Sequence, residues 1–257
     1  MNENYVKAGL FFPEEITVEP RTMIISVHKY LKKKGLHIFY NSQVIECNTL
    51  GSLVSTHLAD GRVFMSSKVI VCNGSDFKTL FPKLFAESDL EVSKLQMLRT
   101  KPQGNYKICG SVLTGLSIRR YEAFAECPSY LKIKANEALD SQEKKWGVHI
   151  LFKQAMDGSV ILGDSHEYAD AEHIDKLGFD LDMDIDNFII EKSKEIFQLP
   201  TYEIEQRWYG MYSQCKNSDI FEKTIDKNIH IVTGIGGKGM TGSAGFAKHN
   251  INQLFNS

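Results

Sequence analysis

A glycine-rich segment near the C-terminus places the strongest constraint on the fold. The apolar run 229–232 has the composition of a buried strand, and residues 244–255 have that of a helix. Between them, Gly234, Gly236 and Gly239 satisfy the spacing G-x-G-x-x-G of dinucleotide-binding turns. A strand, a glycine turn and a helix in this order predict an α/β (α+β) fold. Backbone N–H groups at the start of the helix would face an electron-rich group.

The position of this turn is unusual for the first turn of a Rossmann domain. Such a turn is followed by a second strand and by an acidic ribose ligand about 20 residues further on. Here only 18 residues follow Gly239, and none of them is Asp or Glu. We therefore interpret the segment as a late strand-to-helix turn that touches a cofactor whose main site lies elsewhere.

Composition and charge narrow the class of protein. A net charge of −2 gives no electrostatic reason to expect nucleic acid as a partner. The five cysteines form no C-x-x-C pair, which favours a reducing, cytoplasmic location. Residues 1–7 are polar and predict no secretory signal. No apolar run approaches the roughly 20 residues that span a bilayer, so we expect no membrane segment.

Hydrophobic periodicity and turn residues predict the remaining elements. Helices are expected at 21–34, 128–145 and 182–197. Strands are expected at 36–40, 43–47, 53–58, 62–65, 68–72, 91–101, 117–124, 148–155, 160–163 and 203–209. This layout predicts two lobes, one from residues 1–88 with 201–257 and one, rich in sheet, from residues 89–200.

Six segments in order carry a resemblance to a known family. They are residues 18–21, 68–74, 94–100, 158–166, 207–210 and the glycine loop. In these segments the chain resembles the D-amino-acid oxidase and glycine oxidase (DAO) superfamily of FAD-dependent amine oxidoreductases. The resemblance implies a Rossmann-type FAD-binding lobe with an inserted antiparallel-sheet lobe for substrate. It also implies that hydride passes from the carbon of a small primary or secondary amine to the flavin.

Two segments point to one branch of this superfamily. Residues 116–124 and 163–168 are most similar to the branch that oxidises aminoalkylphosphonates. Relatives that take amino acids carry an arginine soon after the Trp-x-Gly element, and it clamps the carboxylate. Residues 211–213 occupy that stretch here and include no arginine, so an α-amino acid is not the expected substrate.

One departure from the family pattern is large. The family begins with a strand, a glycine turn and a helix that hold the FAD pyrophosphate, and residues 1–20 cannot supply this unit. We therefore expect a form of the enzyme that is truncated at its N-terminus and binds FAD weakly. The alternative is a non-catalytic fragment, or one half of a split flavoprotein that needs a partner chain.

The resemblance implies a set of cofactor-binding residues. The glycine loop would approach the isoalloxazine ring and ribityl chain, Asn73 and Gly74 would line the cofactor at a strand end, and the backbone of Val44 would pair with the adenine. The structural alternatives are a tight helix entry, an ordinary turn and a core valine. The loop residues concerned are Gly234, Gly236, Gly237, Lys238, Gly239, Met240 and Thr241.

Four residues are candidates for the substrate side of the site. Arg119 could clamp an anionic group bidentately, and Arg120 would then point to the opposite face of its strand. His166 ends a strand, and the family places the stretch with Trp208 and Tyr212 beside the flavin. Surface or core positions are the structural alternatives for all of them. The spacing of His166 and His173 matches no metal signature, so we predict no metal.

Overall fold

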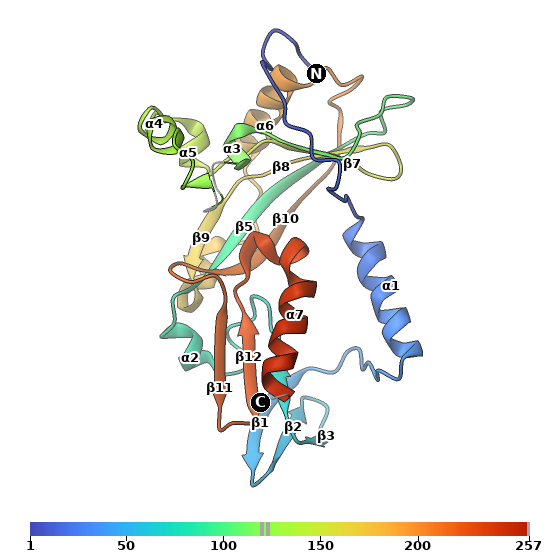
Figure 1. Cartoon of the computed structure of the whole chain (residues 1–257), viewed down its shortest axis with the longest axis vertical. Coiled ribbons are helices and arrows are strands. Elements are labelled where there is room, and N and C mark those ends of the chain that lie inside the picture. The colour runs from blue at the N-terminus through green and yellow to red at the C-terminus, as the bar shows by residue number, and fades with distance from the viewer. Residues whose placement is uncertain (119–120, 122–123, 256–257) are drawn as a thin grey trace. The chain divides into compact units, whose positions relative to one another are not determined.

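The computed structural model describes residues 1–118, 121 and 124–255, which fall into two compact units (Figure 1). The first unit contains Met1–Ile38, Lys94–Glu167 and Phe179–Gly210. The second contains Phe39–Ser93, Tyr168–Gly178 and the chain from Met211 onward. Each unit has its own cluster of buried apolar side chains.

The second unit is built on two small sheets. One is an antiparallel meander in the order β1-β2-β3, made of Val44–Leu50, Leu53–Leu58 and Val63–Ser66. The other has the order β11-β12-β4, made of Phe221–Ile225, Ile229–Thr233 and Val69–Val71. In it β12 and β4 are parallel, with Ile231 opposite Val71. Their apolar sequences are those of strands buried on both faces.

Helix α7, Gly239–Phe255, follows β12 through the short 3₁₀ helix η3, Gly236–Lys238. Asn250 is the buried residue of α7, and its Nδ2 donates to Glu222 Oε1 at 2.5 Å. This bond ties the helix to the β11–β12 hairpin (Figure 1). The core beneath the sheet includes Phe77, Phe85, Leu90, Ile229 and Ile231.

The first unit holds most of a larger sheet with the strand order β10-β5-β8-β7-β6. Strand β8 pairs antiparallel with both β5 and β7, and β7 pairs antiparallel with β6. Residues of β5 and β10 belong to both units. The bounds are Leu90–Thr100 for β5, Ser111–Leu113 for β6, Leu151–Gln154 for β7, Val160–Gly163 for β8, Glu167–Asp170 for β9 and Ile204–Cys215 for β10.

Helix α6, Met183–Ile196, packs on this sheet through Ile185 and Ile189. Helix α1, Pro20–Lys33, begins with a proline at its first position, where the missing N–H costs no helical bond. Lys153 holds the entry to α1, because its Nζ contacts Glu19 Oε1 at 2.9 Å and the Val18 carbonyl at 2.5 Å. The short helices are α2 Pro82–Ala86, α3 Gly115–Ile118, α4 Tyr130–Ala135, α5 Gln142–Lys145 and η2 Ala171–Leu177.

Three sequence predictions about these elements are wrong. Residues 36–40 form no strand; Phe39 is exposed and contacts Phe64, and Asn41 turns the chain with φ +52°. The stretch 117–124 does not begin as a strand, because Ile118 N donates to Thr114 O at 3.1 Å and closes a helical turn. The single helix expected at 128–145 is two, since Ser141 caps a new helix through its hydroxyl.

No helix within the described residues is long and apolar enough to cross a membrane.

Candidate functional site

The carboxyl ends of β4 and β12 form the centre of the candidate site. Parallel strands end at the same edge of a sheet, and ligands of open α/β sheets gather there. Asn73 and Gly74 follow β4, and Gly234 follows β12. The structure therefore brings these three predicted residues to one edge of the same sheet.

Two buried hydroxyl groups hold these strand ends together. Thr233 Oγ1 donates to the Gly74 carbonyl at 2.7 Å, and Ser213 Oγ donates to the same oxygen at 2.9 Å. The backbone N–H of Gly234 donates to Ser213 Oγ at 3.2 Å. Neither Ser213 nor Thr233 was predicted as a site residue, because neither belongs to a local functional motif. Together they fix the Asn73–Gly74 turn against the start of the glycine loop.

The backbone of the glycine loop explains two of its glycines. Gly234 has φ +77°, and a Cβ there would lie 2.6 Å from Leu90 Cδ2. Gly236 has φ +67°, and a Cβ there would lie 3.2 Å from Gln214 Cβ. The fold itself therefore requires glycine at both positions, in agreement with the helix-entry alternative.

Other loop positions are open to a ligand. A Cβ on Gly237 would meet only Tyr212 Oη, at 3.7 Å, and Gly237 is exposed, as are Met240 and Thr241. The first turn of α7 contains no acidic residue. The first N–H groups of a helix have no partner within the helix and carry partial positive charge. This end of α7 is therefore suited to an electron-rich group.

Asn73 offers a hydrogen-bond acceptor at the same edge. Its Nδ2 donates to the Asp76 carbonyl at 2.5 Å, which fixes the orientation of the amide. Its Oδ1 is buried and has no hydrogen-bond partner within the described part of the chain. A buried acceptor without a partner costs about 1–3 kcal/mol, and an N–H of a bound heterocycle would remove that cost.

The remaining predicted cofactor residues have contacts that a structural role alone explains. Val44 begins β1 and packs against the core of the second unit, in agreement with the core-valine alternative. Gly239 begins α7, and Lys238 Nζ pairs with Asp219 Oδ1 at 2.6 Å. Cys215 Sγ would lie 3.0 Å from a Cβ on Gly234, and burial raises the pKa of its thiol.

The predicted substrate residues are divided between the two units. Tyr212, half-buried on β10, lies beside the glycine loop in the second unit. Trp208, also half-buried on β10, belongs to the first unit. Arg119 lies outside the described residues, so the structure gives it no position.

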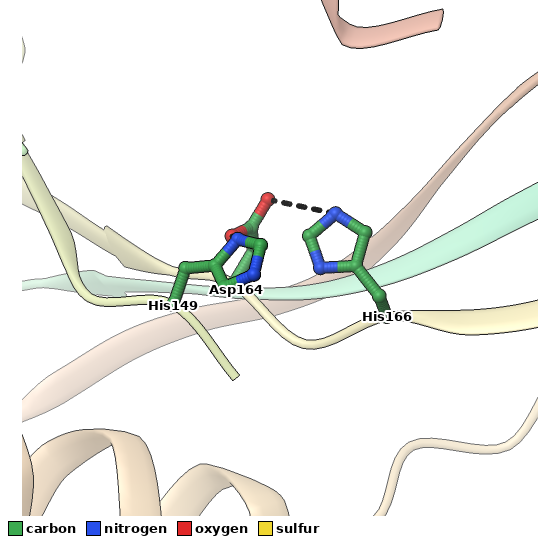
Figure 2. Close-up of side chains that lie close together, drawn as sticks. All are labelled: His149, Asp164 and His166. Carbon is green, nitrogen blue, oxygen red and sulfur yellow. Dashed lines mark ion pairs between the residues drawn. The ribbon is translucent and has the colours of Figure 1, made fainter. Parts of the chain in front are cut away.

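His166 lies in a buried cluster of the first unit, not on the surface. Its Nε2 is 3.6 Å from Asp164 Oδ2, and His149 Nδ1 is 3.8 Å from Asp164 Oδ1. Figure 2 shows the three side chains turned toward one another. His149 was not among the predicted residues, because only the pairing of neighbouring strands brings it to His166.

Comparison with known proteins identifies the family. The family model of the FAD dependent oxidoreductases (DAO) matches residues 2–251. Among curated proteins, none matches the sequence.

Solved structures share the fold at low sequence identity. Glycine oxidase from Geobacillus kaustophilus has a TM-score of 0.56 at 8% identity, over 86% of this chain and 50% of its own. NikD, an unusual amino acid oxidase essential for nikkomycin biosynthesis, has a TM-score of 0.62 at 11% identity, over 86% and 53%. Glycerol-3-phosphate dehydrogenase from Bacillus halodurans, complexed with FAD, has a TM-score of 0.59 at 15% identity, over 91% and 42%.

The chain thus spans about half the length of the solved structures that it matches. The matched family model covers nearly the whole sequence, and FAD is the cofactor of that family. The chain belongs to the DAO family of FAD dependent oxidoreductases.

Proposed function

We propose that the chain forms part of a flavoenzyme that oxidises a small primary or secondary amine, with FAD held in part by the loop 234–241. The observation that carries this proposal is the Gly74 carbonyl, which accepts from both Ser213 and Thr233. These two bonds hold the Asn73 acceptor and the start of α7 at one edge of the sheet. A cofactor that carries both N–H groups and electron-rich groups would need an acceptor for the first and N–H donors for the second.

Each of the residues at this sheet edge would have a separate role toward FAD. FAD, when bound, supplies the acceptor for a hydride. The N–H groups at the start of α7 would stabilise negative charge beside them. Asn73 Oδ1 would accept from an N–H of the bound ring and orient it. Tyr212 lies next to Gly237 and would limit the space over this part of the cofactor.

The reaction class is supported by the activities named for several solved relatives. Besides glycine oxidase, these include an iminodiacetate oxidase, an L-amino acid deaminase and a fructosyl peptide oxidase, at 11–15% identity. All of these names describe oxidation or deamination of compounds that bear an amine. The glycerol-3-phosphate dehydrogenase does not belong to that group, so the family alone does not fix the substrate.

For the substrate we propose an aminoalkylphosphonate, such as aminoethylphosphonate or its N-methyl form. The resemblance of residues 116–124 and 163–168 supports this choice. Amino-acid-oxidising relatives carry a carboxylate-binding arginine in the stretch that corresponds to residues 211–213. Here the Ser213 hydroxyl donates to the Gly74 carbonyl, so Ser213 does not take over the role of that arginine. A phosphonate carries more charge and more acceptor oxygens than a carboxylate and suits an arginine fork such as that of Arg119.

We also propose that the protein is located in the cytoplasm. All five cysteines are free thiols, which supports a reducing, cytoplasmic compartment. The expected partners are the small amine and a further protein segment or chain that completes FAD binding.

The test measures kcat/KM of the FAD-supplied protein for aminoethylphosphonate, its N-methyl form, glycine, sarcosine and D-alanine. We expect at least a tenfold preference for a phosphonate. Arg119→Lys should raise its KM at least tenfold, because lysine keeps the charge but loses the fork. Lys132→Arg, on the short helix α4, is the control, because it also exchanges one cationic side chain for the other and should leave KM unchanged.

A clear preference for an amino acid would contradict the phosphonate proposal and leave amine oxidation standing. Bound FAD without turnover of any amine would contradict the enzyme proposal. That second result would favour the alternative, a non-catalytic part of a split flavoprotein.

A further inference from the structure

We propose that His149, Asp164 and His166 form a binding site for a divalent transition-metal ion, with Zn²⁺ as the best-suited ion. One ligand atom from each residue lies within 4.8 Å of the other two. All three residues belong to the first unit, so the site depends on no contact between the units. It is independent of FAD and of the amine-oxidase proposal.

The distances suit a small tetrahedral ion. Zn–N and Zn–O bonds of about 2.0–2.1 Å place neighbouring ligand atoms about 3.3 Å apart. Asp164 Oδ2 is 3.6 Å from His166 Nε2, and Asp164 Oδ1 is 3.8 Å from His149 Nδ1. The imidazole rings are tilted by 38° with centroids 4.8 Å apart. These two distances end on different carboxylate oxygens, so metal binding would require rotation of the Asp164 carboxylate and of the imidazoles to bring one atom of each residue to bonding distance.

The hydrogen bond of His166 orients the ring for metal binding. Its Nδ1 lies 3.0 Å from the carbonyl oxygen of Gly147. A carbonyl can only accept, so Nδ1 carries the hydrogen. In this tautomer Nε2, on the side of Asp164 Oδ2, is the nitrogen that would bind a metal ion. A backbone carbonyl that accepts from the non-ligating nitrogen is the usual second contact of a metal-bound histidine.

The backbone fixes the positions of the three side chains. His149 N donates to Asp164 O at 2.8 Å, and His166 N donates to Trp146 O at 2.9 Å. At Gly147, which has φ +56°, a Cβ would lie 2.9 Å from His166 Cβ. Glycine is therefore needed for the close approach of the two segments. A site whose ligands are already held in place loses little conformational entropy when the ion binds.

Burial and ligand chemistry favour a transition metal. The side chains of His166, Asp164 and His149 are 1%, 12% and 17% exposed. Two imidazoles and one carboxylate suit zinc, copper, iron or nickel and do not suit Mg²⁺ or Ca²⁺, which prefer oxygen ligands. Three protein ligands leave the fourth position of Zn²⁺ to water.

The test is a titration of the chelator-treated protein with Zn²⁺ in competition with a chromophoric chelator, with and without FAD. We expect one ion per chain with a dissociation constant of 1 μM or lower. His149→Ala and His166→Ala should each weaken binding at least 100-fold. His173→Ala, at an exposed position of the second unit, should leave the affinity unchanged.

Two further measurements separate metal binding from effects on folding. Circular dichroism in the absence of metal should show the same fold for the wild type and for the conservative variant Asp164→Asn, which should still lose affinity. Co²⁺ in place of Zn²⁺ should give the visible bands of a tetrahedral ion without the near-ultraviolet bands of thiolate ligands. Substoichiometric Zn²⁺, or equal affinity in the wild type and the His149→Ala and His166→Ala variants, would overturn the proposal.

Discussion

Thr233 donates a hydrogen bond through Oγ1 to the carbonyl oxygen of Gly74 at 2.7 Å, although 159 positions separate the two residues. Thr233 is the last residue of β12, and Gly74 lies just beyond β4. The bond therefore joins the carboxyl ends of two parallel strands. It sets the position of the turn that carries Asn73 relative to the glycine loop.

Thr233→Val should remove this bond while keeping the shape of the side chain. Ser213 would remain as a donor to Gly74 O, so we expect a loss of about 1 kcal/mol in the free energy of unfolding. The fall in FAD affinity should be larger than the fraction of unfolded protein can explain, because the turn that carries Asn73 is no longer fixed. Chemical denaturation and FAD titration measure the two effects, with Thr22→Val on an exposed face of α1 as control. Unchanged stability and FAD affinity would contradict the role of the bond.

The buried carboxylate of Asp186 should be a major determinant of stability. Its side chain is fully buried, accepts from Arg207 Nε at 2.8 Å and also accepts from Gln96 Nε2. Asp186→Ala would leave both donors without this acceptor, and because the Arg207 side chain is 35% exposed, the expected loss is about 1–3 kcal/mol. Asp184→Ala, at an exposed position of the same helix turn, should cost less than about 1 kcal/mol. Similar urea midpoints for the two variants would argue against the network.

Asp157 should contribute to acid sensitivity. Hydrogen bonds from Ser159 and then Arg99 lower its carboxyl pKa from 3.8 to about 2. Because the folded-state pKa is the lower one, the stabilisation is complete above pH 3.8 and is lost as the pH falls toward 2. The side chain is 51% exposed, so the effect should not exceed about 1 kcal/mol.

Asp157→Asn should therefore make the free energy of unfolding less dependent on pH between 4 and 2, as measured by urea denaturation at several pH values. Asp140→Asn is the control carboxylate. A wild-type slope retained in Asp157→Asn would show that other groups cause the acid sensitivity.

The sequence predicted those elements whose signal is local. The apolar runs of β4 and β12, the neighbouring strands β7 and β8, and the periodic pattern of α6 all match the structure. Strand β11 was missed, because its central residues are polar and exposed and its only apolar residues are at its ends.

The parts of the site that the sequence could not predict depend on long-range pairing. The hydroxyl groups of Ser213 and Thr233 meet Gly74 only because β4 and β12 are parallel neighbours. In the same way, His149 meets His166 through the backbone bonds between the β7 and β8 segments. A histidine or serine in an isolated segment carries no signal of either arrangement.

The most direct test of FAD binding by the glycine loop is a fluorescence titration of the protein with FAD, comparing Gly237→Val with Gly245→Val. A side chain at Gly237 meets only Tyr212 Oη, and one at Gly245 meets no atom within 4 Å, so both variants should fold. We expect weak but saturable binding by the wild type and by Gly245→Val, and a dissociation constant at least ten times higher for Gly237→Val. Equal affinity for the two variants, with folding confirmed by circular dichroism, would contradict the account.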